Sequence, residues 1–248
     1  MIIQIISLVC SFFILTLFPC CKEIEKPNKK GTIIFLHGIS SVGKTSVAHT
    51  LQDILPEYYN YADLDTLTAM MPKKLVNFDP NVQPSKQAAD QGIVIEPITY
   101  DGQQVMMVKT GPYAQKGGML LSELYKLYAL HGFNLIIEFS FSGIDQQLQE
   151  KYLKSYLKEL HQFRVYFINL TVSPDIAAQR EIKRGGFKGL SAGQRLFMLK
   201  KFTNPATFDL EIDTSHFTPL EIAQEIEDFI RVHPQPEAFE RLYKQYYN

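Results

Sequence analysis

Eight consecutive residues, GISSVGKT from Gly38 to Thr45, are the stretch of the sequence best suited to chemistry. They match the pattern G-x-x-x-x-G-K-[ST], in which backbone N–H groups surround phosphates at the positive end of the following helix. In such a loop a lysine, here Lys44, reaches the β- and γ-phosphates and takes part in catalysis, while the Thr45 hydroxyl ligates Mg²⁺. The sequence therefore predicts a bound nucleotide with Mg²⁺ as cofactors, and a nucleotide-binding set of Gly38, Ser40, Ser41, Gly43, Lys44, Thr45 and Ser46.

The residues around this loop agree with the motif. An apolar strand, TIIFL, precedes it, and an amphipathic helix, KTSVAHTLQDIL, follows it, which is the context that a phosphate-binding loop requires. A guanine-reading N-K-x-D is missing, because the only Asn-Lys pair, Asn28-Lys29, precedes the domain and lacks the aspartate. Motor ATPases usually carry further domains for which this chain has no room. A compact phosphotransferase fits better than either class.

Three carboxylates stand where phosphoryl transfer needs them. Asp63 and Asp65 lie between a short strand and a helix, and Glu138 ends the apolar run NLIIEF. A carboxylate beside the loop can accept the proton of an attacking hydroxyl, and one at a strand end can hold the metal or its waters. From the residues alone, Asp65 is equally a helix N-cap, and Glu138 is equally a solvated strand end.

A basic segment, QREIKRGGFKGLSAGQR, gathers cations around glycines. An arginine-bearing lid of this kind would stabilise the charge that spreads in the transition state and would exclude water. Arg180 and Arg184 share one helical face at a spacing of four residues, which favours them as a catalytic pair. The alternative is an ordinary basic helix that ends in a Gly-Gly cap.

Short apolar runs alternate with helical stretches from Thr32 onward, which predicts an α/β fold with a mainly parallel sheet in a three-layer α/β/α sandwich. Residues 92–112 break this alternation and predict a β-hairpin that turns at Asp101-Gly102. Pro97 would confine the first hairpin strand to a sheet edge. The inserted hairpin is either a substrate wall or an excursion without function.

The first 21 residues form a hydrophobic signal or anchor segment, 22–30 a polar linker, and 31–248 one phosphotransferase domain. The apolar run is long enough to span a bilayer. Lysines after it, such as Lys22 and Lys26, favour membrane attachment with the kinase domain in the cytoplasm. A cleaved secretory or lipoprotein signal and a misassigned start codon stay open.

Charge and cysteine content narrow the classes of partner. The chain has 25 Lys and Arg against 26 Asp and Glu, so it lacks the basic excess that nucleic-acid binding needs. All three cysteines lie within the first 21 residues, so no disulfide stabilises the domain. We expect a small-molecule partner and no nucleic acid.

Five segments in this order, GTIIFLHGISSVGKTSVAHTLQ, DLDTLTAMMP, NLIIEFSF, QREIKRG and FDLEIDTS, resemble chloramphenicol phosphotransferase and its relatives over most of residues 31–230. The resemblance implies an adenylate-kinase-like P-loop NTPase fold and ATP-dependent phosphorylation of a small-molecule hydroxyl. It implies Asp65, and not Asp63, as the catalytic base, with Arg180 and Arg184 as lid arginines. It also makes the hairpin, through VKTGP, an acceptor wall. The sequence departs from the family at three positions, His37, Glu138 and Phe187.

Two functions follow as hypotheses. The first is a Mg-ATP-dependent O-phosphotransferase that acts on a hydroxyl of a small molecule. The alternative is a membrane-tethered nucleotide-binding regulatory protein without phosphotransfer activity.

Overall fold

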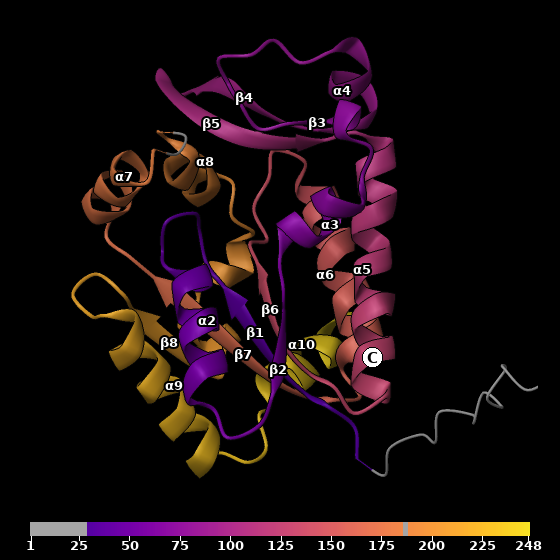
Figure 1. Cartoon of the computed structure of the whole chain (residues 1–248), viewed down its shortest axis with the longest axis vertical. Coiled ribbons are helices and arrows are strands. Elements are labelled where there is room, and N and C mark those ends of the chain that lie inside the picture. Colours follow the sequence, from indigo (N-terminus) through magenta and orange to yellow (C-terminus); the bar gives the residue numbers. More distant parts are fainter. Residues whose placement is uncertain (1–28, 186–187) are drawn as a thin grey trace, which may run out of the picture.

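The computed structural model describes residues 29–185 and 188–248. A five-stranded sheet in the order β2-β6-β1-β7-β8 forms its centre (Figure 1), and every strand pairing in it is parallel. The strands are β1 (Thr32–His37), β2 (Tyr59–Ala62), β6 (Asn134–Phe139), β7 (Arg164–Thr171) and β8 (Leu210–Asp213). Because the strands are parallel, their carboxyl ends meet at one edge, where ligands of such folds bind.

Helices cover both faces of this sheet, so its strands are apolar on both sides. In β1, Ile33 and Phe35 pack in one hydrophobic cluster, and Ile34 and Leu36 pack in another. The first cluster includes residues of α5 (Pro112–Leu130), α6 (Gln146–Leu160) and α10 (Ala238–Tyr247). The second includes residues of α2 (Lys44–Ile54) and α9 (Pro219–Val232). The predicted three-layer α/β/α arrangement is confirmed.

Aromatic rings fill the first cluster. The ring of Phe35 lies 5.4 Å from those of Tyr156 and Phe167, 5.9 Å from that of Phe141 and 6.0 Å from that of Phe239, measured between centroids. Such spacing is typical of favourable aromatic pairs. These contacts fix α6, α10 and the segment after β6 against the sheet.

The predicted hairpin is present and lies above the main sheet in a separate three-stranded sheet (Figure 1). Strands β4 (Ile93–Tyr100) and β5 (Gln103–Thr110) pair antiparallel, and the turn places Asp101 at φ 48° and Gly102 at φ 74°. The edge assignment of the first strand needs correction, because β3 (Val76–Asn77) pairs with Ile93 and Val94 of β4. Pro97 lies beyond that short pairing, so it breaks no hydrogen bond to β3.

Seven further elements complete the described part of the chain. They are α3 (Leu64–Met70), α4 (Lys86–Gln91), α7 (Pro174–Lys183), α8 (Leu190–Leu196) and the short 3₁₀ helices η1 (Lys73–Leu75), η2 (Lys200–Thr203) and η3 (Pro205–Thr207). The sequence analysis did not predict α5, which has 19 residues.

The hydrophobic segment 1–21 and the linker up to residue 28 lie outside the described residues. Among the helices that the structure describes, none combines the length and the apolar character needed to cross a bilayer. Membrane attachment through residues 1–21 therefore stays a prediction.

Candidate active site

The phosphate-binding loop connects β1 to α2 at the carboxyl edge of the sheet. Its first glycine, Gly38, has φ 151°, and a Cβ there would lie 2.6 Å from the carbonyl oxygen of Leu170. Its second glycine, Gly43, has φ 108° and caps the N-terminus of α2. Ser41 adopts φ 62° between them. A left-handed backbone of this kind turns successive N–H groups into one concavity, where an anion can bind.

The ammonium group of Lys44 lies across its own loop. It donates hydrogen bonds of 3.0 Å to the carbonyl oxygens of Gly38 and Ile39. Burial lowers the pKa of Lys44 from its ordinary value, and the nearby Glu138 carboxylate opposes this effect. The side chain is thus held over the concavity, in reach of a phosphate.

Thr45 and Glu138 lie together, as the metal prediction requires. The Thr45 hydroxyl donates to Oε2 of Glu138 at 2.9 Å. The described residues contain no cluster of three or more His, Cys, Asp or Glu side chains that could hold a metal unaided. Mg²⁺ in such sites uses one or two protein oxygens and completes its shell with phosphates and water. The two side chains fit that requirement.

The two aspartates after β2 have different surroundings. Asp63 is the N-cap of α3, because its side chain accepts from the backbone N–H of Thr66 at 2.9 Å in a reciprocal capping box. Its other oxygen accepts from the Tyr61 hydroxyl at 2.9 Å. Asp65 lines the cavity, and no described residue donates to its carboxylate. The N-cap interpretation of Asp65 is therefore wrong.

The pKa of Asp65 is raised from its ordinary value by partial burial, and then by the negative charges of Asp63 and Glu138. A carboxylate with a raised pKa accepts a proton more readily. The surroundings of Asp65 therefore suit a base, which stays a prediction for this residue.

Arg180 lies in α7 and Arg184 is the C-cap of that helix. Both side chains contact the phosphate-binding loop, but at different residues. Arg180 donates to the carbonyl oxygen of Val42 at 3.2 Å and to the Thr214 hydroxyl at 3.0 Å. Arg184 donates to the Ser40 hydroxyl at 3.1 Å. Thr214, which the sequence analysis did not single out, is buried and donates to the same Val42 carbonyl at 2.7 Å. Arg180 is thus fixed against the loop backbone, whereas Arg184 contacts a side chain.

One cavity of about 840 Å³ joins these groups. At one end it is lined by loop residues 40–46 with Arg180 and Arg184. At the other end it is lined mainly by apolar and aromatic side chains, including Leu64, Leu67, Phe78, Ile95, Val108, Leu121, Tyr125, Phe139, Tyr152, Tyr156 and Leu190. The hairpin supplies Ile95, Val108 and Thr110 to this lining, so it forms part of the wall.

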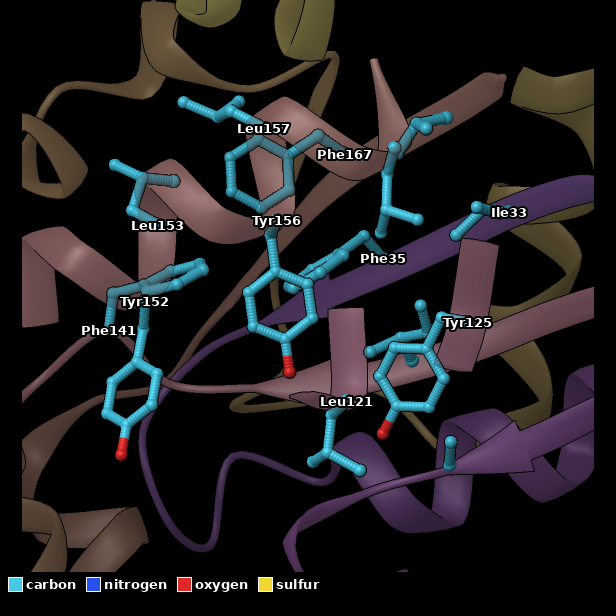
Figure 2. Packing of buried hydrophobic residues seen from close by; sticks show 14 of the residues in the cluster. Ile33, Phe35, Leu121, Tyr125, Phe141, Tyr152, Leu153, Tyr156, Leu157 and Phe167 are labelled. Atoms are coloured by element: carbon cyan, nitrogen blue, oxygen red, sulfur yellow. The ribbon is translucent and has the colours of Figure 1, made fainter. Parts of the chain in front are cut away.

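The sequence analysis did not identify three tyrosines of this lining. Figure 2 shows that the hydroxyls of Tyr125, Tyr152 and Tyr156 point to the same side, away from Leu153 and Leu157. Burial raises the pKa of the Tyr125 and Tyr156 hydroxyls, so both stay protonated and can donate. Tyr152 and Tyr156 are four residues apart on α6, a spacing that places them on one face. That spacing was the one feature of the sequence that could have indicated their shared place in the cavity lining.

His37, one of the departures from the family, is buried beside the loop. Its Nδ1 lies 2.8 Å from Oδ1 of Asn169, and its Nε2 accepts from the backbone N–H of Phe141 at 3.4 Å. Asn169 in turn donates to Glu211 at 2.6 Å. This network requires a neutral imidazole with its proton on Nδ1.

We expect His37 to make the protein less stable as the pH is lowered. Burial lowers its pKa from 6.5 to about 4, so between these values the unfolded chain binds a proton that the folded chain excludes. The free energy of unfolding should therefore decrease from about pH 7 to pH 4, by roughly 3 kcal/mol through this residue. Urea unfolding at several pH values measures it. In His37→Asn that part of the pH dependence should vanish, and identical slopes in both proteins would contradict the assignment.

Comparisons with known proteins identify the family to which the chain belongs and the fold that it shares. A model of the chloramphenicol phosphotransferase-like protein family matches residues 31–231. A protein of Mycobacterium tuberculosis, named "Putative O-phosphotransferase" in strains CDC 1551 and H37Rv, is 26% identical over 218 residues, which is 88% of this chain and 90% of that protein.

Among solved structures, a sugar kinase from Janibacter sp. is 15% identical with a TM-score of 0.51, over 82% of this chain and 96% of that one. A shikimate kinase from Acinetobacter baumannii is 15% identical with a TM-score of 0.49, over 82% of this chain and 94% of that one. The first of these likenesses shows the fold, that of P-loop kinases. Since the family match covers most of the chain, the protein is a member of the chloramphenicol phosphotransferase-like family.

Proposed function

We propose that this protein transfers the γ-phosphoryl group of ATP to a hydroxyl group of a neutral small molecule. The observation that carries the proposal is the shared cavity, in which the phosphate-binding loop and the Asp65 carboxylate face one space with an apolar far end. A phosphate donor and an alcohol bound there would meet beside a base, which is the alignment that phosphoryl transfer needs.

The donor end would hold the nucleotide. Backbone N–H groups of the loop and the Lys44 ammonium would bind the phosphates, and Thr45 with Glu138 would hold Mg²⁺. When bound, Mg²⁺ neutralises the charge on the phosphate oxygens. Lys44 would exchange its two bonds to neutral loop carbonyls for bonds to phosphate oxygens, in which the acceptor is charged as well as the donor.

Asp65 would act on the acceptor. Its carboxylate accepts the hydroxyl proton as the acceptor oxygen bonds to the γ-phosphorus, and the bond from that phosphorus to the bridging oxygen breaks to leave ADP. Arg184, already at Ser40 on the cavity side, would stabilise the charge on the transferred group. Arg180 is bound to Val42 and Thr214, so its contribution would be to hold the loop and the neighbouring part of the nucleotide.

The charge of the lining supports a neutral acceptor. The cationic side chains among the lining residues are Lys44, Arg180 and Arg184, all at the phosphate end. The anionic side chains among the lining residues are Asp63, Asp65 and Glu138. Of these, Asp65, the proposed base, would lie beside the bound acceptor and would repel a carboxylate or phosphate on it. Tyrosine hydroxyls and apolar walls suit an uncharged molecule with an aromatic or aliphatic body and a reactive alcohol.

Incubation of the full chain with Mg²⁺ and γ-labelled ATP tests the proposal. The acceptors would be a set of neutral aromatic alcohols, chloramphenicol among them, with gluconate and shikimate as anionic controls. We expect label on at least one neutral alcohol and on neither anion. Binding of ATP with no transfer to any neutral alcohol would instead support the nucleotide-binding protein without phosphotransfer.

A further inference from the structure

A glutamine of α8, Gln194, contacts the phosphate-binding loop. The side-chain oxygen of Gln194 accepts a hydrogen bond from the backbone N–H of Ser40, and both residues line the cavity. The hydroxyl of the same Ser40 accepts from Arg184. Ser40 is therefore a point where both α8 and the C-cap of α7 touch the loop, in addition to the contact of Arg180 with the Val42 carbonyl.

The buried carboxylate of Glu181 ties α8 to α7. It accepts from the backbone N–H groups of Gly189 at 2.9 Å and Ser191 at 2.5 Å, and its residue is fully buried. A charged, buried acceptor of two backbone N–H groups makes a strong connection. Since Arg184 follows α7 directly, Gln194 and Arg184 are held in a fixed relation.

The other side of α8 packs against the hairpin without intervening side chains. The backbone N–H of Met106 in β5 donates to the carbonyl oxygen of Gly189 at 3.2 Å. A Cβ at Gly193 would lie 2.3 Å from the Met106 carbonyl oxygen and 2.7 Å from the Met107 sulfur. With backbone against backbone, a displacement of α8 must displace β5 as well. Two residues of β5, Val108 and Thr110, line the acceptor end of the cavity.

We propose that Gln194 is a positioning residue that couples nucleotide binding to the acceptor wall. The inference rests on the proposed function. The side-chain oxygen of Gln194 accepts the hydrogen bond from the Ser40 N–H that a phosphate oxygen would accept in the nucleotide complex. An anionic phosphate oxygen is a stronger acceptor than a neutral amide oxygen. A bound triphosphate displaces this side chain, and α8 shifts with it. Because Gly189 and Gly193 contact the backbone of β5, the shift of α8 moves β5 as well. Nucleotide and acceptor affinities are then linked, each changing the other by the same factor.

Hydrogen exchange of the full chain with Mg²⁺ and the non-hydrolysable analogue AMPPNP tests this coupling without an acceptor. In the wild type, AMPPNP should change amide exchange in β5, including that of Met106, by several-fold. In Gln194→Ala this response should disappear although AMPPNP still binds. Because the analogue no longer displaces a hydrogen-bond partner, its affinity should rise by about three- to tenfold.

Two further variants separate this role from a structural one. Gln194→Glu keeps an acceptor oxygen but adds a charge that repels phosphate, so its AMPPNP affinity should fall by about tenfold. Leu196→Ala, at an exposed site of the same helix, should respond as the wild type does. A structural defect would weaken binding in Gln194→Ala, whereas the coupling predicts tighter binding.

The outcomes also separate the two proposals. If AMPPNP binds to the wild type and β5 does not respond, or if β5 responds equally in Gln194→Ala, the coupling is wrong and the proposed function stands. If AMPPNP does not bind to the wild type, the proposed function fails and the coupling fails with it.

Discussion

Replacement of Asp65 by Asn is expected to lower kcat by about 10²- to 10⁴-fold, the usual contribution of a general base. The amide has nearly the same shape as the carboxylate but cannot accept the hydroxyl proton. The affinity for Mg-ATP should stay within about twofold of the wild type, because Asp65 has no hydrogen bond to the phosphate-binding loop. Steady-state kinetics with an acceptor identified by the labelling experiment, together with calorimetry of nucleotide binding, measure both quantities.

Asp63→Asn is the matched control. Asparagine also caps helices well, so this variant should fold as the wild type does and keep kcat within a few-fold. If Asp63→Asn lost turnover and Asp65→Asn kept it, the base would be Asp63 and the role implied for Asp65 would be wrong.

The pH profile gives an independent check on Asp65. The base must be ionised to act, so kcat should fall as the pH drops through its pKa. That pKa is raised by partial burial, by Asp63 and by Glu138, so the acid limb should lie above the range of an ordinary aspartate. Asp65→Asn should lack this limb in its residual activity.

Replacement of Lys44 by Met is expected to lower kcat by about 10²- to 10³-fold or more, the cost of removing one donor that stabilises transition-state charge. It should also weaken Mg-ATP binding, because under the proposed function the ammonium would move from two loop carbonyls to the phosphates in the bound state. Methionine preserves the length and most of the apolar volume of the stem. Calorimetry and kinetics on the same preparation measure the two effects.

Lys44→Arg is the control for charge. Its planar guanidinium differs in size and shape from the compact ammonium group that donates to the Gly38 and Ile39 carbonyls, so we expect little recovery of turnover. Full activity in Lys44→Met would show that the loop does not bind the reacting phosphate.

The sequence by itself determined those features of the protein that depend on residues close together along the chain. The loop from Gly38 to Thr45 is contiguous, so its backbone conformation and its position between β1 and α2 follow from local spacing. Strands β1, β6 and β7 are apolar on both faces, which indicates a covered parallel sheet wherever they pair. The hairpin turn at Asp101-Gly102 is likewise a local signal, since both residues adopt positive φ there.

Only the tertiary structure decided how distant segments meet. It assigned the helix cap to Asp63 and left the Asp65 carboxylate facing the cavity, a distinction that two aspartates separated by one residue do not reveal in a sequence. It brought Thr214 to Val42 and Gln194 to Ser40, contacts that join residues 172 and 154 positions apart. The acceptor end likewise combines α5, α6 and β5. The physical reason is that such contacts depend on how the elements pack, and residue spacing along the chain carries no information about packing between remote segments.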